Sequence, residues 1–394
     1  MLDIWPALPL VIRGSGYAAS QGKGADDGII AALKHNDRVH QILLDGFSSS
    51  LLEEVVAVMQ VPFPALTNLE IISWGETATV VPEAFLGRSA QRLQSCIVQG
   101  IAFSGQWKLL LTANHLVILR LEDIPHSGYI SPDTMVTCLS AMPNLKQLDL
   151  GFRSSRSRPD RASQRPPLLI RVIHPSLTHF WFQGISEYME DLVSRIDVPL
   201  LDNLDILFFD QLIFNTPQLH NFLARTEKFQ AHNQAAVVFY DDAIFLKAQF
   251  SSNSSLKLGI TCTKSDWQIS SMAQICSSSL VPFSTLERLD LREGRNPLPL
   301  WQDEVENTQW LELLRPFTAL KDLYFKENFV PLVAPALQEL IGERVTKGLP
   351  SLRNLFVEGF KQSGPLHETI GQFVASRQLS DPPVAIHNWD GQSY

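Results

Sequence analysis

The stretch MPNLKQLDLGF (residues 142–152) places leucines at positions 145, 148 and 150, with polar residues between them. Leu148 and Leu150 are two residues apart, and this period sends both side chains to one face of a short β-strand. Leu145 fits the bend that leads into the strand. One such strand cannot bury its apolar face by itself, so further copies of the pattern are expected elsewhere in the chain.

The pattern L-x-x-L-x-L recurs along the whole sequence. Neighbouring copies are 23 to 34 residues apart, except across one gap of 85 residues between Leu201 and Leu286. The gap is about three repeats long, so we interpret it as degenerate units and not as a separate domain. The first apolar position of each copy falls at Val39, Leu66, Leu93, Leu116, Leu145, Leu177, Leu201, Leu286, Leu320 and Leu352.

A repeat of this length and pattern is typical of leucine-rich repeats, in which parallel strands stack and share one continuous core. We therefore predict an α/β fold, a single curved solenoid over residues 1–394 with parallel strands on the concave face and helices on the convex face. The irregular units fall at about residues 208–285, where two strands are joined by a hairpin at Asp241-Asp242. A doubly wound α/β domain with chance leucines is the alternative.

The segments that connect the strands are expected to be helical. Apolar residues recur in them at three- and four-residue spacing, which favours amphipathic helices. Ser131-Pro132 and Thr216-Pro217 are helix-start signals, because proline suits the first helical position. The clearest segments are LLEEVVAVMQ (51–60), SPDTMVTCLSAM (131–142) and SEYMEDLVSRI (186–196).

Charge and composition exclude several kinds of partner. The net charge of −9 disfavours attraction of the whole molecule to nucleic acid or to an anionic membrane. The four cysteines lack a compact metal-binding spacing, so we expect buried, reduced thiols. The N-terminus lacks the basic segment of a signal peptide, and no apolar run reaches the ~18 residues that a membrane span needs. The sequence thus predicts a cytoplasmic and/or nuclear protein.

No motif in the sequence carries a complete catalytic or metal-binding signature. GSGYAASQGKGADDG (14–28) lacks a phosphate-binding loop, because Tyr17 stands where a glycine is needed and Gly24 where Ser or Thr is needed. GISEY (184–188) ends in Tyr188 instead of the glycine of a nucleophile elbow, and Ser186 fits a helix N-cap. We predict no catalytic residue, no metal, no cofactor and no enzymatic activity.

Several phrases resemble the fungal F-box-type proteins that are expanded in basidiomycetes. The resemblance implies a leucine-rich region that holds the substrate of a cullin-type ubiquitin ligase, behind an F-box that binds a Skp-type adaptor. No F-box opening is found here, so adaptor binding is expected only if an F-box lies upstream. The phrases are WPALPLVIRG (5–14), ALKHNDRVHQILL (32–44), IPHSGYISP (124–132), EDLVSRIDVPLLDNLDILFFDQLIFNTPQL (190–219), TQWLELLRPFTALKDLYF (308–325) and APALQEL (334–340).

The segment RSSRSRPDRASQRPP (153–167) is rich in arginine, serine and proline. Such a composition does not fold by itself, so the segment is expected to form an exposed loop after the strand at 145–150. A localisation signal, a phosphorylation switch, a contact with an anionic partner and a merely solvated insertion are the alternatives. Its arginines are Arg153, Arg156, Arg158, Arg161 and Arg165.

The alternation within each repeat also predicts a binding face. Residues between the buried leucines point out from the concave side of the sheet, where a partner can contact them. Exposed aromatics contribute much of the energy of an interface, so Trp181, Tyr324 and Phe356 are the expected anchors. The acidic residues suggest a row of negative charge that favours a basic partner. The predicted partner-binding residues are Glu70, Arg120, Asp149, His179, Trp181, Asp205, Arg288, Asp290, Tyr324 and Phe356.

These features favour a protein-binding leucine-rich-repeat module that resembles the substrate-recognition region of F-box proteins. The expected partner is a protein held on the concave face, and neither a membrane nor nucleic acid is expected. The alternative is a free-standing repeat scaffold, or a paralogous fragment without a ligase role.

Overall fold

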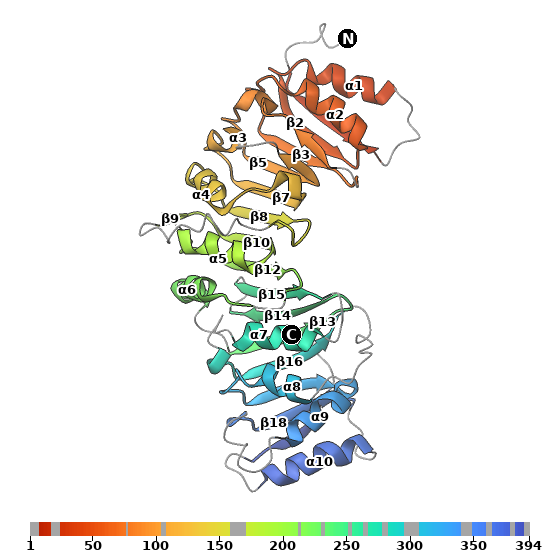
Figure 1. Ribbon diagram of the computed structural model, residues 1–394, viewed down its shortest axis with the longest axis vertical. Coiled ribbons are helices and arrows are strands. Elements are labelled where there is room, and N and C mark those ends of the chain that lie inside the picture. Colours follow the sequence, from red (N-terminus) through yellow and green to blue (C-terminus); the bar gives the residue numbers. More distant parts are fainter. Residues whose placement is uncertain are drawn as a thin grey trace. The chain divides into compact units, whose positions relative to one another are not determined.

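The chain forms two compact units, Met1–Leu201 and Asp202–Tyr394. The architecture is that of a computed structural model, shown in Figure 1. The structure describes residues 8–16, 24–75, 78–103, 108–157, 171–211, 214–229, 233–250, 254–262, 267–277, 283–294, 307–339, 349–359, 365–378 and 383–389.

The first unit is built on a parallel sheet whose strands follow one another in chain order. Every neighbouring pair described in this sheet runs parallel, as the long connections between successive copies of the repeat require. The strand order is β1 (Leu10–Ser15), β2 (Val39–Asp45), β3 (Asn68–Ile72), β5 (Ser95–Gln99), β7 (Ile118–Ile124), β8 (Gln147–Phe152) and β10 (His179–Gly184) (Figure 1).

The repeated leucines form the core of this unit. Leu145, Leu148 and Leu150 are fully buried. Leu148 pairs in register with Leu119 on one side and with Phe180 on the other, so equivalent repeat positions lie side by side. Two short parallel pairs lie outside the main sheet, β4 (Thr79–Val81) with β6 (Ile101–Phe103) and β9 (Val172–Ile173) with β11 (Ile196–Asp197).

Helices connect the strands where the spacing of apolar residues predicts them. The Ser48 side chain accepts a hydrogen bond from the Leu51 N–H and caps α2, while Ser131 caps α4 ahead of Pro132. The helices of this unit are α1 (Gly24–Leu33), α2 (Ser49–Val58), α3 (Lys108–Leu111), α4 (Pro132–Ser140) and α5 (Ser186–Arg195), with short 3-10 helices η2 (Phe85–Arg88) and η3 (His126–Gly128).

One predicted cap is wrong. Ile185 occupies the N-cap position of α5, and Ser186 is already the first helical residue. The N-cap position itself makes no side-chain capping hydrogen bond, because isoleucine has no polar side-chain atom. A hydroxyl must precede the first turn to reach its free N–H groups, and Ser186 lies one residue too late.

The second unit contains a mixed sheet. β13 and β14 pair antiparallel, as do β14 and β15, and the other neighbouring strands within this unit run parallel. The strand order is β12 (Asn203–Phe208), β15 (Ser255–Thr261), β14 (Ala243–Gln249), β13 (Gln234–Phe239), β16 (Arg288–Glu293), β17 (Asp322–Lys326), β18 (Asn354–Glu358) and β19 (Ala385–Trp389).

The irregular stretch therefore differs from a series of degenerate parallel units. The hairpin predicted at Asp241-Asp242 is present, and so short a connection can only join antiparallel strands. As a result β15, and not β13, is the neighbour of β12. The helices of the second unit are α6 (Pro217–Arg225), α7 (Gln268–Ser277), α8 (Asn307–Leu314), α9 (Val330–Gln338) and α10 (Pro365–Arg377), with 3-10 helices η5 (Glu227–Phe229), η7 (Phe283–Thr285) and η8 (Glu327–Phe329).

Large apolar side chains fill the interior of both units. In the second unit the fully buried Trp310 packs against Phe239 and Phe329, with ring centroids 5.8 and 6.4 Å apart respectively. The four cysteines are buried and unpaired, as the sequence predicts, and burial raises the pKa of Cys96 to about 12. The predicted leucine-rich-repeat-like α/β fold is confirmed, whereas its extension through both units as a single solenoid stays a prediction.

Candidate functional site

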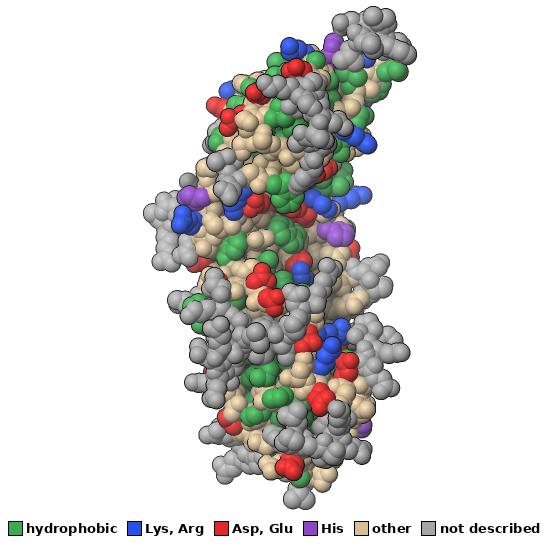
Figure 2. Space-filling view, turned by 90° about the vertical axis from the view of Figure 1, so that its right-hand side faces the viewer, with side chains coloured by type: hydrophobic (Ala, Val, Ile, Leu, Met, Phe, Trp, Pro, Cys, Tyr) green, Lys and Arg blue, Asp and Glu red, His purple; other side chains and the backbone are tan. Residues whose placement is uncertain are grey.

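Each strand presents two faces with different side chains. In β3, Leu69 and Ile71 are buried, whereas Asn68, Glu70 and Ile72 are half-buried. We call the face that carries the half-buried alternate residues the open face. Acidic and basic side chains lie next to one another, with hydrophobic ones between them, on the side of the molecule seen in Figure 2.

The open face of the first unit carries one row of residues in register from strand to strand. Directly paired residues point to the same side of a sheet, so the row is continuous. Three predicted site residues, Arg120, Asp149 and Trp181, are neighbours within it. The row consists of Arg13, Leu43, Glu70, Ile97, Arg120, Asp149 and Trp181.

Ionic and packing contacts restrain this row. Arg120 Nε lies 2.9 Å from Asp149 Oδ2, and Gln147 donates a 3.0 Å hydrogen bond to the same carboxylate, in a residue that is only 7% exposed. The indole of Trp181 covers Gly151, where an added Cβ would lie 2.6 Å from its Cζ3 atom. His179 is exposed at the start of β10, and its Nδ1 lies 2.8 Å from the Thr178 hydroxyl.

The arginine-rich segment is described only at its start. Arg153 Nε and Nη2 donate hydrogen bonds of 3.0 and 2.8 Å to the two carboxylate oxygens of Asp123, so its guanidinium is already held. Arg156 is exposed. Arg158, Arg161 and Arg165 lie outside the described residues, and the switch or localisation role of the segment stays a prediction.

The open face of the second unit carries a longer row. Two lysines stand side by side on β15 and β14, and the small residue Ala236 separates them from the β16 carboxylate. The predicted site residues Asp290, Tyr324 and Phe356 are consecutive in this row. The full register is Asp205, Lys257, Lys247, Ala236, Asp290, Tyr324, Phe356 and His387.

The carboxylates of this row are paired with cations. Lys257 Nζ lies 2.8 Å from Asp205. Asp290, only 4% exposed, accepts hydrogen bonds from Arg288 at 3.1 Å and from Arg292. The expectation of an acidic row is therefore wrong for Asp205 and Asp290, and also for Asp149 in the first unit, because neighbouring cations compensate each carboxylate.

At the other end of the row, aromatic rings stack on one another. The Tyr324 and Phe356 rings are 4.2 Å apart and 6° from parallel, and His387 stacks on Phe356 at 5.0 Å. The guanidinium carbon of Arg288 lies 3.8 Å from the Tyr324 ring centroid, an arrangement worth roughly 0.5–1 kcal/mol at an exposed site. Burial raises the pKa of the Tyr324 phenol above its ordinary value.

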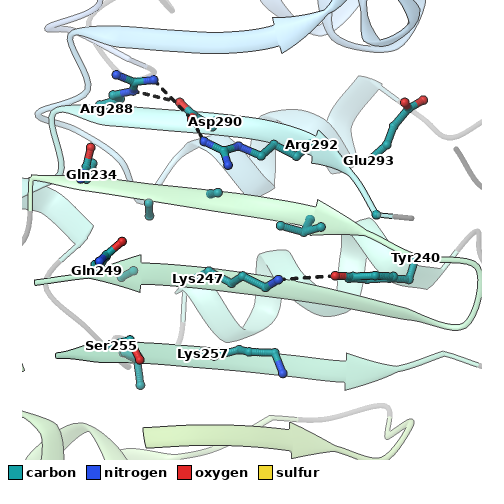
Figure 3. Close-up of a pocket in the computed structure, with 16 residues that line it drawn as sticks. Gln234, Tyr240, Lys247, Gln249, Ser255, Lys257, Arg288, Asp290, Arg292 and Glu293 are labelled. Carbon is teal, nitrogen blue, oxygen red and sulfur yellow. Dashed lines mark hydrogen bonds and ion pairs between the residues drawn. The ribbon is translucent and has the colours of Figure 1, made fainter. Parts of the chain in front are cut away.

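A hollow of about 690 Å³ lies over strands β13, β14, β15 and β16 of this open face. Ala236 and Val238 contribute small apolar side chains to its lining. In Figure 3, Arg288 and Arg292 converge on Asp290 on one side, while two lysines project from neighbouring strands on the other. The cationic members of the lining are Lys247, Lys257, Arg288 and Arg292.

Several residues of this surface are absent from the sequence-based prediction. Lys247 and Lys257 lie in strands without the L-x-x-L-x-L pattern, and His387 and Trp389 lie in β19, which also lacks it. Apolar–polar alternation in AIFLKAQ and SLKLGIT is the signal that could have placed both lysines on the open face. Their adjacency depends on the hairpin register.

Fold and surface define a leucine-rich-repeat-like α/β protein. No protein-family model matches the chain, and no curated protein shows significant similarity to it. A search of solved structures finds the leucine-rich repeat-containing protein LegL7 from Legionella pneumophila, at 14% sequence identity over 88% of this chain and 92% of that one. The TM-score of 0.29 is too low for any argument to rest on this similarity.

Within the described residues, no group of three or more His, Cys, Asp or Glu side chains gathers in a way that could hold a metal ion. None of the helices described is both long and apolar enough to cross a membrane.

Proposed function

We propose that the chain is a protein-binding repeat module that holds its partner on the open face. The row from Asp205 to His387 carries the proposal, because it aligns one outward residue from each of the strands β12 to β19. At a strand spacing of ~4.8 Å such a row is roughly 34 Å long. That length suits a polypeptide better than a small molecule.

The chemistry of the row also supports binding over catalysis. Asp205 and Asp290 are held in ion pairs with lysine and arginine, and no general base faces a nucleophile among the row residues. Half-buried aromatics such as Tyr324 and Phe356 are the side chains on which interfaces depend most. We therefore propose a non-enzymatic role.

The finer proposal is that the module recognises the substrate of a cullin-type ubiquitin ligase, in the cytoplasm or the nucleus. Its support is the resemblance of several sequence phrases to fungal F-box-type proteins. Co-purification of the chain with a Skp-type adaptor tests it. Failure of the full-length protein to bind the adaptor would favour a free-standing scaffold instead.

Aromatic substitutions test the binding face. Affinity purification with Trp181→Ala and Tyr324→Ala should recover the partner at least tenfold less efficiently than wild type, with each variant still folded and its melting temperature lowered by only a few degrees. The matched controls are Trp74→Ala and Trp267→Ala, which remove exposed tryptophans outside the two rows. Unfolding of both row variants would show that these residues are structural and would contradict the proposed face.

A further inference from the structure

The hollow over β13 to β16 carries more positive charge than its own carboxylates compensate. Asp290 is shared between Arg288 and Arg292, so one negative charge faces two positive ones. Glu293, the other acidic residue of the lining, lies 3.6 Å from Lys326 on β17. The excess stands out in a chain whose net charge is −9.

Lys247 adds to this excess. It forms no ion pair with any described carboxylate, and its Nζ lies 3.4 Å from the Tyr240 hydroxyl. Its register partner Lys257 is paired with Asp205, and its Nζ also lies 4.3 Å from the centroid of the Phe245 ring. Aromatic contacts thus position both ammonium groups before any ligand arrives, which lowers the entropy lost on binding.

The floor between the two sets of cations is small and apolar. Ala236 lies between Lys247 and Asp290 in the register row, and Val238 follows it on the same face of β13. A longer side chain in place of Ala236 would fill the hollow. The site therefore offers positive charge on two sides of an apolar base.

We propose that this hollow binds an acidic polypeptide segment, in which carboxylate side chains contact Lys247, Lys257 and Arg292 and an aliphatic side chain rests on Ala236. The inference rests on the proposed protein-binding function and specifies the charge of the partner. It is opposite in sign to the basic partner that the row of acidic residues suggests in the sequence. Charge complementarity of this kind determines specificity and the rate of association.

The neighbouring aromatic row argues against a nucleic acid as the ligand. Single-stranded nucleic acids bind by stacking bases on free aromatic faces. Here Tyr324 is stacked between Arg288 and Phe356, and Phe356 between Tyr324 and His387. These ring faces are occupied, so phosphates near the lysines would lack a stacking platform beside them.

The test uses fluorescence anisotropy with a short, end-blocked, fluorescein-labelled peptide of alternating glutamate and leucine. Wild-type protein should bind it more weakly as salt increases, and should bind matched glutamine–leucine and lysine–leucine peptides at least tenfold more weakly. The double variant Lys247→Gln/Lys257→Gln should lose at least tenfold in affinity, which corresponds to about 1.4 kcal/mol. Ala236→Leu should weaken binding to a similar extent.

The charge control is Lys321→Gln, which removes a lysine that pairs with Glu287 outside the hollow and should change the affinity less than twofold. Equal binding of the glutamine peptide, or unchanged affinity in the double lysine variant, would overturn the proposal. So would lysine-dependent binding of a phosphoserine peptide or an RNA oligonucleotide without binding of the glutamate peptide. Trp181 does not line the hollow, so its variant tests the general binding function separately.

Discussion

The regular strands of the first unit and the meander β15–β14–β13 of the second arrange charge on their open faces differently. Across the regular pair β7 and β8, Arg120 lies opposite Asp149 and the charges compensate each other. Across the antiparallel pair β14 and β15, Lys247 lies opposite Lys257 and two like charges meet. Like charges directly opposite each other destabilise a sheet, and Asp205 compensates only one of the two, Lys257.

The comparison shows what an interruption of the repeat changes. Both regions bury leucines on the core face, so the interruption leaves the interior intact. It changes which side chains become neighbours on the open face, because the hairpin reverses β14. The irregular region of the sheet carries the hollow over β13 to β16 and its excess of positive charge.

The largest expected effect concerns the buried leucines of each unit. Leu148→Ala in β8 and Leu246→Ala in β14 should each lower the free energy of unfolding by about 2–5 kcal/mol, because both leucines are fully buried. Urea unfolding followed by circular dichroism measures the loss. A cost below about 1 kcal/mol for Leu246→Ala alone would show that β14 is not integrated into the core as the regular strands are.

The next largest effect compares the loss of stability at a carboxylate paired with two arginines and at a carboxylate paired with one. Asp290→Asn should cost about 1.5–3 kcal/mol, because the buried charge-assisted hydrogen bonds to Arg288 and Arg292 weaken together. Asp149→Asn should cost less, since Arg120 is more exposed than either arginine. Asp205→Asn, at a half-exposed pair, is the control and should stay below about 1 kcal/mol. Equal costs at all three positions would remove the distinction.

Gly259 and Gly151 each lie beneath an aromatic ring on the open face of their unit. Gly259→Ala would place Cβ 2.4 Å from the Phe245 ring, and Gly151→Ala would place it 2.6 Å from the Trp181 ring. Both substitutions should lower stability by about 1–3 kcal/mol through overpacking, measurable by thermal unfolding. Phe245→Leu should partly restore the Gly259→Ala variant. A neutral result at either glycine would show that the ring above it moves aside freely.

The smallest expected effect is an acid sensitivity of the first unit. Burial lowers the pKa of His174 below its ordinary value of 6.5, and neither ring nitrogen has a hydrogen-bond partner among the described residues. The unfolded chain therefore binds a proton more readily than the folded one. The contribution of neutral His174 to the free energy of unfolding is fully present above pH 6.5 and decreases as the pH falls through that value towards the lower folded pKa. The melting temperature should decrease by about 2–4 °C for each kcal/mol lost. In His174→Gln this part of the decrease should disappear, and an unchanged pH profile would contradict the assignment.

Sequence periodicity predicts the fold well where each repeat keeps its three apolar positions. Leu145, Leu148 and Leu150 place a strand and its buried face, and the recurrence of the same pattern gives this strand its parallel neighbours. The order of β12, β15, β14 and β13 could not be predicted, because apolar alternation does not specify which strands pair. Even the recognised turn at Asp241-Asp242 gives only the local antiparallel pair.

The candidate site is predictable as a face but not as a set of interactions. The period of two assigns Asp290 and Tyr324 to the open face, and the structure places both there. Arg288 bonds to Asp290 and also covers the Tyr324 ring. These contacts depend on side-chain conformation, which a sequence pattern does not contain. The lysine pair depends on a hairpin register between residues in different strands.

The antiparallel meander also has a consequence for the order in which the second unit acquires its structure. Phe239 pairs with Ile244, and Gln249 with Ser255, so these contacts close very short loops that form within microseconds. Asn203 pairs with Ser255 across a sequence separation of 52 residues, which carries a larger entropic cost of closure. Amides of β13, β14 and β15 are thus expected to gain protection first in pulsed hydrogen exchange, making the segment that departs from the repeat the template on which the parallel strands assemble.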